Sequence, residues 1–359
     1  MKIGILTGGG DCPGLNAVIR GVVKTACKKY NWDCLGIESG FEGLILEGHT
    51  RELNPYRIRG ILPIGGTILW SSNKGDPFNY PQEENGKVVK KDLSGRAMEK
   101  FKDLGLNALI VVGGDGTMTI ANKFYKMGMP VIGVPKTIDN DLMSTDLTFG
   151  FSTAVETATY ALDKLHTTAA SHKRVIVVEL MGRYVGWIAL HSGISGGADC
   201  ILIPEILFDI DKVCEHIKGR VKQGSSFSIV VVSEGAKPLG GSVTALGLDK
   251  SSGVERLGGI GEKVAKWIEG KVDVDVRTTV LGHIQRGGGP NSFDRILSTR
   301  FGYEAVELIK EGRFGRMVCL KGQDIESVTL DDAIAKQKAI DPDGSIVKTA
   351  EAIGICMGR

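Results

Sequence analysis

Short runs of apolar, often β-branched residues alternate with helical patterns along most of the 359-residue chain. The first run, KIGILT, is followed by LNAVIRGVVKTACKKY, where Val18, Val22 and Ala26 recur at i, i+4 and i+8 and share one helix face. The same order returns in ALIVVGG before GTMTIANKFYKMG and in RVIVVEL before VGWIALHSGISGG. This alternation predicts βαβ units with mostly parallel sheets, and therefore an α/β fold.

The length of the chain and the grouping of these units predict two α/β domains. One hydrophobic core rarely serves a chain of this length, and the units form one group before about residue 150 and another after about residue 172. Two segments interrupt the alternation. Residues 79–92 are polar and predict a solvated loop or a small hairpin, and residues 235–261, rich in Gly and Ser, predict a mobile connection.

Composition excludes several classes of protein. The formal net charge is only +2, so the overall charge gives no reason to expect nucleic-acid binding. No apolar run approaches the roughly 18 residues that span a bilayer, and the apolar part of MKIGILTGGG is too short for a signal peptide. The seven cysteines form no CxxC pair, which favours reduced thiols over a disulfide framework. We expect a cytoplasmic protein with no membrane or nucleic-acid partner.

Glycine-rich turns follow the predicted strands, where ligands of an open parallel sheet bind. In LTGGGDCPGLN, Gly8, Gly9 and Gly10 would let backbone N–H groups approach phosphate oxygens beside a helix N-terminus. A tight turn between strand and helix would explain these three glycines about equally well.

The segment VVGGDGT, residues 111–117, is more informative. Asp115 could simply cap a helix, but a cap does not require glycines on both sides. A carboxylate beside amides that hold a polyphosphate is how an enzyme binds Mg²⁺ against its nucleotide. The motif therefore predicts a phosphoryl donor with Mg²⁺, although GGDGT occurs in more than one kinase superfamily and does not name the acceptor.

A third strand, in VIGVPKTIDNDL, ends in Lys136, Thr137, Asp139, Asn140 and Asp141. An alcohol that attacks a γ-phosphoryl group needs a proton acceptor, and cations neutralise the charge of the transferring group. Asp139 or Asp141 could accept the proton, with Lys136 beside the phosphates. The alternative is a capping cluster for a following helix.

Cations flanked by glycines suggest a phosphorylated acceptor. Arg183 follows the strand VIVVEL, and His283 and Arg286 follow another predicted strand in TTVLGHIQRGGGP. Arg174 and Arg277 precede these two strands, at the opposite strand ends. An adjacent subunit could bring this second pair of arginines into a site, which suggests an oligomer.

Taken together, these segments resemble the 6-phosphofructokinase family. GGGDCPGLNAVIRG, GGDGT, PKTIDND, SHKR, MGRYVGW, TTVLGHIQRGG and the DR at 294 and 295 run in family order from residue 3 to about 310, and TIDND with GHIQRGG is very specific. The resemblance implies phosphate transfer to the 1-hydroxyl of fructose 6-phosphate by a homotetramer, or a homodimer, with shared active sites.

The resemblance also implies two Rossmann-like, three-layer domains with mostly parallel sheets and the active site in the cleft between them. Residues 1–150 plus about 285–325 would form the larger, donor-binding domain. Residues from about 151 to 284 plus the C-terminal segment would form the smaller domain, which binds fructose 6-phosphate.

Family roles carry over residue by residue. Catalysis would fall to Asp139 as proton acceptor, to Arg183 in the transition state and to Lys136. The resemblance implies that the donor, with Asp115 also on Mg²⁺, would be bound by Gly9, Asn73, Lys74, Gly114, Asp115, Gly116 and Thr117. It also implies that the sugar phosphate would be bound by Thr137, Ile138, Asp139, Arg174, Met181, Gly182, Arg183, Glu234, Arg277, His283 and Arg286, with Arg174 and Arg277 from the neighbouring subunit.

Two positions bear on the phosphoryl donor, and one favours ATP whereas the other favours pyrophosphate. In this family Gly directly after GGD leaves room for ATP and Asp goes with pyrophosphate, and this chain has Gly116. The position before TIDND is usually Gly in the common ATP enzymes and Lys in pyrophosphate enzymes, and this chain has Lys136. Because an Asp would crowd and repel an α-phosphate, we expect ATP with Mg²⁺ as donor, with pyrophosphate as the alternative.

Other departures and alternatives remain. Asn73 stands where the common ATP enzymes have Arg, Trp70 replaces a small residue, and the basic effector-site residues of bacterial ATP enzymes are matched chiefly by Arg20. Regulation by ADP or phosphoenolpyruvate is therefore not expected. A more distant alternative is another GGDGT kinase, such as an NAD or lipid kinase, which would not require PKTIDND or GHIQRGG. A catalytically silent subunit should have lost Asp115, Asp139 or Arg183, and all three are present.

Overall fold

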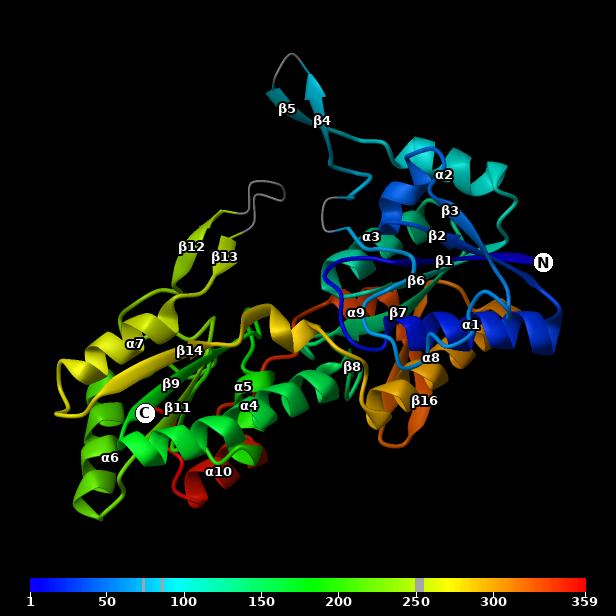
Figure 1. Ribbon diagram of the computed structural model, residues 1–359. Coiled ribbons are helices and arrows are strands. Elements are labelled where there is room, and N and C mark those ends of the chain that lie inside the picture. The colour runs from blue at the N-terminus through cyan, green and yellow to red at the C-terminus, as the bar shows by residue number, and fades with distance from the viewer. Residues whose placement is uncertain (73–74, 85–86, 249–254) are drawn as a thin grey trace. The chain divides into compact units, whose positions relative to one another are not determined.

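The structure is a computed structural model that describes residues 1–72, 75–84, 87–248 and 255–359 (Figure 1). It divides into two compact units. Unit 1 comprises Met1–Ser152 and Arg286–Gln337, and unit 2 comprises Thr153–Gln285 and Lys338–Arg359. Strands and helices alternate in both units, so the predicted α/β fold is confirmed. The roles predicted for the two domains stay predictions.

Unit 1 is built on an eight-stranded sheet in the order β16-β15-β7-β6-β1-β2-β3, with β8 paired to β7. The strands are β1 (Lys2–Thr7), β2 (Asp33–Ile37), β3 (Thr50–Leu53), β6 (Ala108–Gly113), β7 (Val131–Thr137), β8 (Phe149–Gly150), β15 (Arg316–Lys321) and β16 (Asp324–Thr329). β2, β1, β6, β7 and β15 run parallel, whereas β3 and β16 pair antiparallel at the two edges. The carboxyl ends of β1, β6 and β7 therefore meet at one edge of the sheet.

Helices cover this sheet. They are α1 (Leu15–Tyr30), α2 (Ser94–Asp103), α3 (Asp115–Lys126), α8 (Ser292–Lys310), α9 (Leu330–Ile334) and the 3₁₀ helix η1 (Gly40–Leu44). One core cluster joins α2, α3, α9 and η1 to the sheet. The face of α1 predicted to be apolar, with Val18, Val22 and Ala26, is fully buried. Gly21 lets α1 approach α8, since a Cβ there would lie 2.9 Å from the Thr299 carbonyl oxygen.

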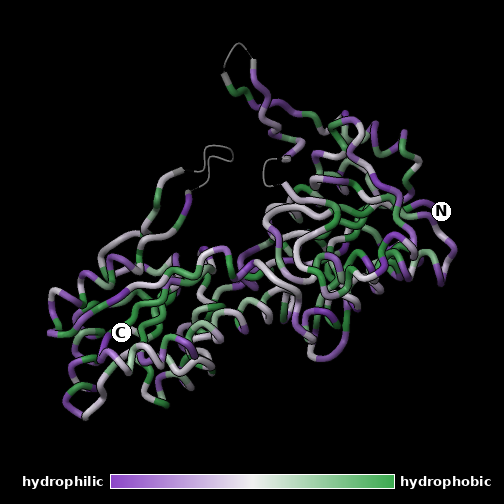
Figure 2. The backbone as a smooth tube through the Cα atoms, in the orientation of Figure 1, coloured by the Kyte–Doolittle hydropathy of each residue, from purple (hydrophilic) through white to green (hydrophobic). Residues whose placement is uncertain are grey.

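Unit 2 contains a four-stranded, all-parallel sheet in the order β10-β11-β9-β14. Its strands are β9 (Val175–Leu180), β10 (Cys200–Leu202), β11 (Ser228–Ser233) and β14 (Val276–Val280). Its helices are α4 (Phe151–His172, whose first two residues belong to unit 1), α5 (Trp187–Ser195), α6 (Ile210–Lys222), α7 (Ile260–Glu269), the 3₁₀ helix η2 (Gly282–Arg286, whose last residue belongs to unit 1) and α10 (Ser345–Ala352). Figure 2 shows mainly hydrophobic segments in the interior of both sheets, as fits inner strands such as β6 and β9 that are buried on both faces.

The two segments that interrupt the alternation both contain hairpin strands. β4 (Tyr80–Glu84) pairs antiparallel with β5 (Lys87–Lys91), which confirms a small hairpin within residues 79–92. The mobile connection predicted for residues 235–261 is wrong in part, because β12 (Ala245–Leu248) pairs with β13 (Glu255–Leu257) there.

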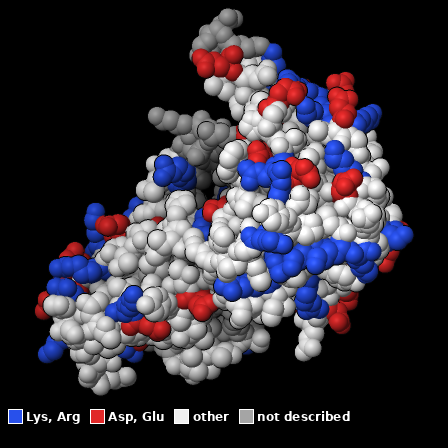
Figure 3. Space-filling model, turned by 45° about the vertical axis from the view of Figure 1, so that its right-hand side comes forward, with Lys and Arg blue, Asp and Glu red and all other residues white. Residues whose placement is uncertain are grey.

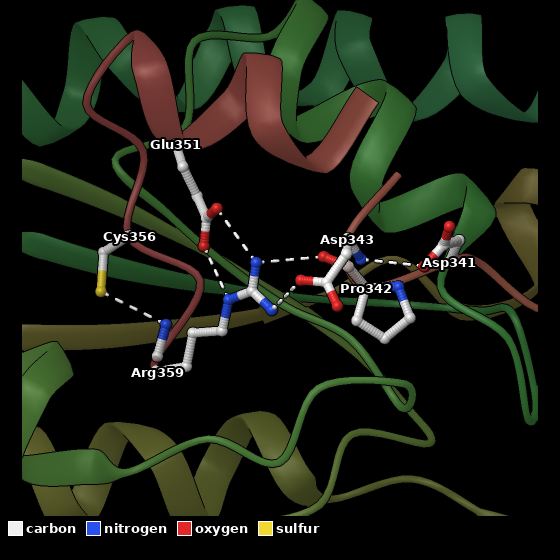
Figure 4. Close-up of polar contacts among 7 residues, drawn as sticks. Asp341, Pro342, Asp343, Glu351, Cys356 and Arg359 are labelled. Atoms are coloured by element: carbon white, nitrogen blue, oxygen red, sulfur yellow. Dashed lines mark hydrogen bonds and ion pairs between the residues drawn. The ribbon is translucent and has the colours of Figure 1, made fainter. Parts of the chain in front are cut away.

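The C-terminal segment belongs to unit 2. The Cys356 N–H donates to the Asp199 carbonyl, and its own carbonyl accepts the Ile201 N–H, both at 2.9 Å, so the segment lies beside β10. The Arg359 guanidinium pairs with Glu351 at 2.8 Å and reaches the Pro342 carbonyl at 3.0 Å (Figure 4). Among the described residues, no helix has the length and apolar character needed to cross a bilayer.

Candidate active site

The polar cluster after β7 is buried and held by its own hydrogen bonds. The Thr137 hydroxyl accepts the Asp139 N–H at 3.1 Å and lies 3.3 Å from an Asp139 carboxylate oxygen. The Asn140 side chain accepts the Thr148 N–H at 3.1 Å, and the Thr148 hydroxyl donates to the Thr137 carbonyl at 2.7 Å. Residues 138–148, all described, form no helix, and the next helix starts at Phe151. The capping alternative is therefore wrong.

Three carboxylates interact electrostatically at this edge of unit 1. Burial raises the pKa of Asp141 to about 6, and the negative charges of Asp139 and Asp115 add to the rise. The Gln337 amide donates to the Asp141 carboxylate at 3.3 Å. Asp115 begins α3 directly after β6, so the ends of β6 and β7 bring their acidic residues together. Such a group of like charges favours a bound cation.

Lys136 lies at the end of the same strand, with 3% of its surface exposed. Its ammonium group donates to the Gly10 carbonyl at 2.5 Å. Burial is the main cause that lowers the pKa of Lys136, and the charge of Arg286 lowers it further. The lysine therefore links the end of β7 to the glycine-rich loop after β1.

The residues present fit a Mg²⁺ ion shared with a nucleotide. Among the described residues, no three His, Cys, Asp or Glu side chains are placed to hold a metal by themselves. Mg²⁺ usually takes only one or two carboxylates, with substrate phosphates and water completing its octahedron. Asp115, whose charge already raises the pKa of Asp141, can supply such a ligand.

Glycines at the ends of β1 and β6 allow close approach of the backbone. A Cβ at Gly113 would lie 2.3 Å from the Thr117 Cβ, and one at Gly8 would lie 2.9 Å from the Thr117 Cγ2. Gly9 has a left-handed φ of 77°, and its N–H donates to the Ser72 carbonyl at 3.2 Å. These contacts are a structural reason for the glycines. The loops after β1 and β6, which carry them, also meet at the predicted donor site.

Gly116 differs from these glycines. An ideal Cβ at Gly116 has no heavy atom within 4 Å, so nothing in the fold requires a glycine there. Gly114, by contrast, would place a Cβ 3.3 Å from the Lys136 carbonyl oxygen. Packing therefore does not account for Gly116. The predicted donor contacts Asn73 and Lys74 lie outside the described residues.

Arg286 lies against the glycine-rich loop. Its guanidinium donates to the Asp11 carbonyl at 3.2 Å, and a Cβ at Gly10 would lie 2.7 Å from the same guanidinium nitrogen. Arg286 ends η2, which also contains the exposed side chain of His283. The sequence placed both residues after one strand and gave no sign of the contact with Asp11.

In unit 2, Met181, Gly182 and Arg183 follow β9, and Glu234 follows β11. The Glu234 carboxylate accepts the Arg183 N–H at 3.0 Å. Arg183 has a left-handed φ of 53°, a conformation that is costly for a residue with a side chain and is common at functional sites. Its guanidinium lies over the Tyr184 ring at 5.2 Å. The structure thus brings two predicted sugar-phosphate ligands into direct contact.

Arg174 and Arg277 lie at the N-terminal ends of β9 and β14, opposite the ends that lead to Arg183 and His283. Arg277 is the second residue of β14, slightly further along than predicted. Asp275, which the sequence analysis did not select, forms ion pairs with both arginines. The prediction that they serve a neighbouring subunit is untested.

A model of the family described as Phosphofructokinase matches residues 2–309. The chain belongs to the phosphofructokinase family. ATP-dependent 6-phosphofructokinase 2 from Clostridium perfringens is 54% identical to it over 357 residues, which cover 99% of this chain and 97% of the relative.

Two further comparisons bear on the donor and on the fold of this phosphofructokinase. Pyrophosphate–fructose 6-phosphate 1-phosphotransferase from Streptomyces coelicolor is 51% identical over 345 residues, covering 95% of this chain and 97% of the relative. Phosphofructokinase from Pichia pastoris in the T-state has a TM-score of 0.80 at 31% identity, covering 99% of this chain and 37% of the yeast chain. The relative named for ATP and the relative named for pyrophosphate are thus nearly equally identical to this chain, so sequence identity alone does not decide between the two donors.

The phosphofructokinase also has a basic recess on unit 1 that sequence matching largely missed. It is lined by Arg20, Lys24, Lys28 and Arg59 with neighbouring loop residues, and Figure 3 shows Lys and Arg side chains gathered on this unit. The charge of Arg20 is the main cause that lowers the pKa of Lys24. The spacing of residues 20, 24 and 28 on one face of α1 is the signal that could have revealed it.

Proposed function

We propose that this phosphofructokinase transfers the γ-phosphate of ATP to the 1-hydroxyl of fructose 6-phosphate, giving fructose 1,6-bisphosphate and ADP. The observation that carries the proposal is the group of Asp115, Asp139 and Asp141 at the ends of two parallel strands, beside glycine-rich loops, in which Asp139 and Asp141 are buried and Asp115 is exposed. The relative named as an ATP-dependent 6-phosphofructokinase supports it across nearly the whole chain.

Gly116 supports ATP as the donor. No neighbour limits a side chain at this position, so a nucleotide that passes beside residue 116 explains the glycine better than packing does. The relative named for pyrophosphate and the presence of Lys136 favour pyrophosphate as the second candidate. However, the Lys136 ammonium already donates to the Gly10 carbonyl, which gives it a role within the protein.

In the proposed mechanism, Asp139 accepts the proton of the sugar 1-hydroxyl as this oxygen attacks the γ-phosphorus. The Thr137 hydroxyl, which accepts the Asp139 N–H and lies beside an Asp139 carboxylate oxygen, orients that carboxylate. Mg²⁺, when bound through Asp115 and the donor phosphates, would neutralise charge on the transferring group. Arg183 would stabilise the same charge in the transition state, and Lys136 would make the glycine-rich loop more positive.

The remaining roles follow the family pattern. Thr137, Ile138, Met181, Gly182, Glu234, His283 and Arg286 would bind the sugar and its 6-phosphate. Arg174 and Arg277 would do so for a neighbouring subunit, which makes a cytoplasmic homotetramer with shared sites the proposed assembly. Their place at the strand ends opposite Arg183 supports this division of roles.

The test is phosphorylation of fructose 6-phosphate with Mg²⁺ and either ATP or pyrophosphate. Turnover with ATP alone is the expected result. Turnover with pyrophosphate alone would mean that Lys136 and Asn73 outweigh Gly116 in selecting the donor. Turnover with neither would remove fructose 6-phosphate as the acceptor.

A further inference from the structure

Asp275 joins two arginines of unit 2: Arg174, directly before β9, and Arg277, in the neighbouring strand β14. One of its carboxylate oxygens accepts the Arg174 Nε–H at 2.5 Å, and the other accepts an N–H from Arg277. The Asp275 carbonyl also accepts the Val175 N–H at 3.0 Å, so its backbone is fixed to the start of β9. The side chains of Arg174, Asp275 and Arg277 keep 29%, 38% and 55% of their surface exposed, so solvent can reach all three.

The carboxylate uses only one edge of each guanidinium. Arg174 is held through Nε, which leaves its two terminal nitrogens as an end-on fork. Arg277 is held through Nη1, which also donates to the Val276 carbonyl at 2.8 Å, so Nε and Nη2 remain as a side-on fork. Either fork can bind a phosphate or carboxylate in bidentate fashion.

We infer that Asp275 is a positioning residue that holds Arg174 and Arg277 ready to bind the 6-phosphate of fructose 6-phosphate. This inference rests on the proposed function, which assigns both arginines to that phosphate. A free arginine samples many rotamers and loses that freedom when it binds. Asp275 fixes one edge of each side chain before the substrate arrives, so less ordering is left for the binding step.

The same contact could act in the opposite way. The Asp275 carboxylate could compete with the phosphate for the guanidinium groups, and its removal would then strengthen substrate binding. The unused forks argue against competition, because the phosphate can bind without displacing the carboxylate. The two possibilities predict opposite changes in KM.

The experiment compares Asp275→Asn, Asp275→Ser and Asp275→Glu with the wild-type enzyme in steady-state kinetics. For Asn and Ser we expect KM for fructose 6-phosphate to rise about 10-fold, because the two arginines then lose their rotamer freedom only when the substrate binds. The kcat value should stay within about twofold of the wild-type value, and KM for ATP should be unchanged. Glu, which keeps the charge, should recover most of the loss. The matched control is Asp343→Asn, which removes another Arg–Asp pair from the same unit and should leave both KM values unchanged.

A second measurement separates this role from a general effect on folding. In a background carrying Arg174→Lys and Arg277→Lys, Asp275→Ser should raise KM no further, because its effect passes through the arginines. An unchanged or lowered KM in folded Asp275 variants would overturn the inference while leaving the proposed function in place. A wild-type enzyme inactive on fructose 6-phosphate would overturn both.

Discussion

Replacing Gly116 with Asp should change the choice of donor and leave the fold intact. The glycine lies in the first turn of α3 and has no heavy atom within 4 Å of an ideal Cβ. An acidic residue in the first turn of a helix is stabilising, and any other residue except proline is better there than glycine by up to about 1 kcal/mol. We therefore expect Gly116→Asp to fold at least as stably as the wild-type protein.

The same carboxylate should act strongly against ATP. At an effective dielectric of about 20, two unit charges about 4 Å apart repel each other by about 4 kcal/mol. Since each 1.4 kcal/mol or so is a factor of ten, kcat/KM with ATP should fall by about 10³. Pyrophosphate has no group that corresponds to the α-phosphate of ATP, so its use should be affected far less.

The assay is kcat/KM for each donor at saturating fructose 6-phosphate, with thermal unfolding of each variant. Gly116→Ala is the matched control, because it adds the Cβ without the charge and should retain most of the ATP activity. If folded Gly116→Asp kept its ATP kcat/KM within tenfold of the wild-type value, the α-phosphate would not lie beside residue 116. The donor assignment based on this glycine would then be wrong.

Four further outcomes follow from the site. Asp139→Asn should lower kcat by about 10²- to 10⁴-fold, the usual contribution of a general base, with an unchanged melting temperature; near-normal turnover would exclude Asp139 as the proton acceptor. Arg183→Gln should lower kcat far more than it raises KM for ATP, as steady-state kinetics would show, whereas a pure KM effect would exclude a transition-state role. Chelation of Mg²⁺ by EDTA should abolish turnover, and added Mg²⁺ should restore it. The raised pKa of Asp141, about 6 against 3.8, means that the folded state binds a proton more tightly. The free energy of unfolding should therefore fall by about 3 kcal/mol as pH rises from about 4 to about 6, and then level off. Urea unfolding of metal-free Asp141→Asn should lack this fall. If the variant and the wild-type protein had the same pH dependence, the fall would belong to other groups.

Much of the fold could be predicted because local pattern and tertiary environment agree. The buried face of α1 was visible in the spacing of Val18, Val22 and Ala26, and the continuous apolar runs of β6 and β9 indicated strands covered on both faces. Strand order was not predictable, since β3 and β16 close the sheet of unit 1 as antiparallel edges without any local signal. The strands β12 and β13 were missed because a Gly- and Ser-rich composition hid a short pairing.

Some residues of the candidate site could likewise be predicted from the sequence, and others could not. Asp115 and Asp139 could be selected because motif and strand end coincide in the sequence. The raised pKa of Asp141 depends on burial and on a charge from another strand, which no linear pattern contains. Asp275 was missed for a related reason: its two partners are Arg277, two residues away, and Arg174, about one hundred residues away, and only the parallel pairing of β9 with β14 joins them.

The charges of unit 1 would explain why the proposed donor site needs a cation. Three carboxylates act on one another at the ends of β6 and β7, and the nearby Lys136 is buried with its ammonium on the Gly10 carbonyl. A polyphosphate, itself strongly negative, would be repelled by this cluster. A divalent cation attracts both the carboxylates and the phosphates, so the acidity that disfavours the bare donor favours its magnesium complex. In the proposed function, the acidic edge would therefore select the magnesium-bound donor, and Asp139 would be the carboxylate that accepts the proton of the acceptor.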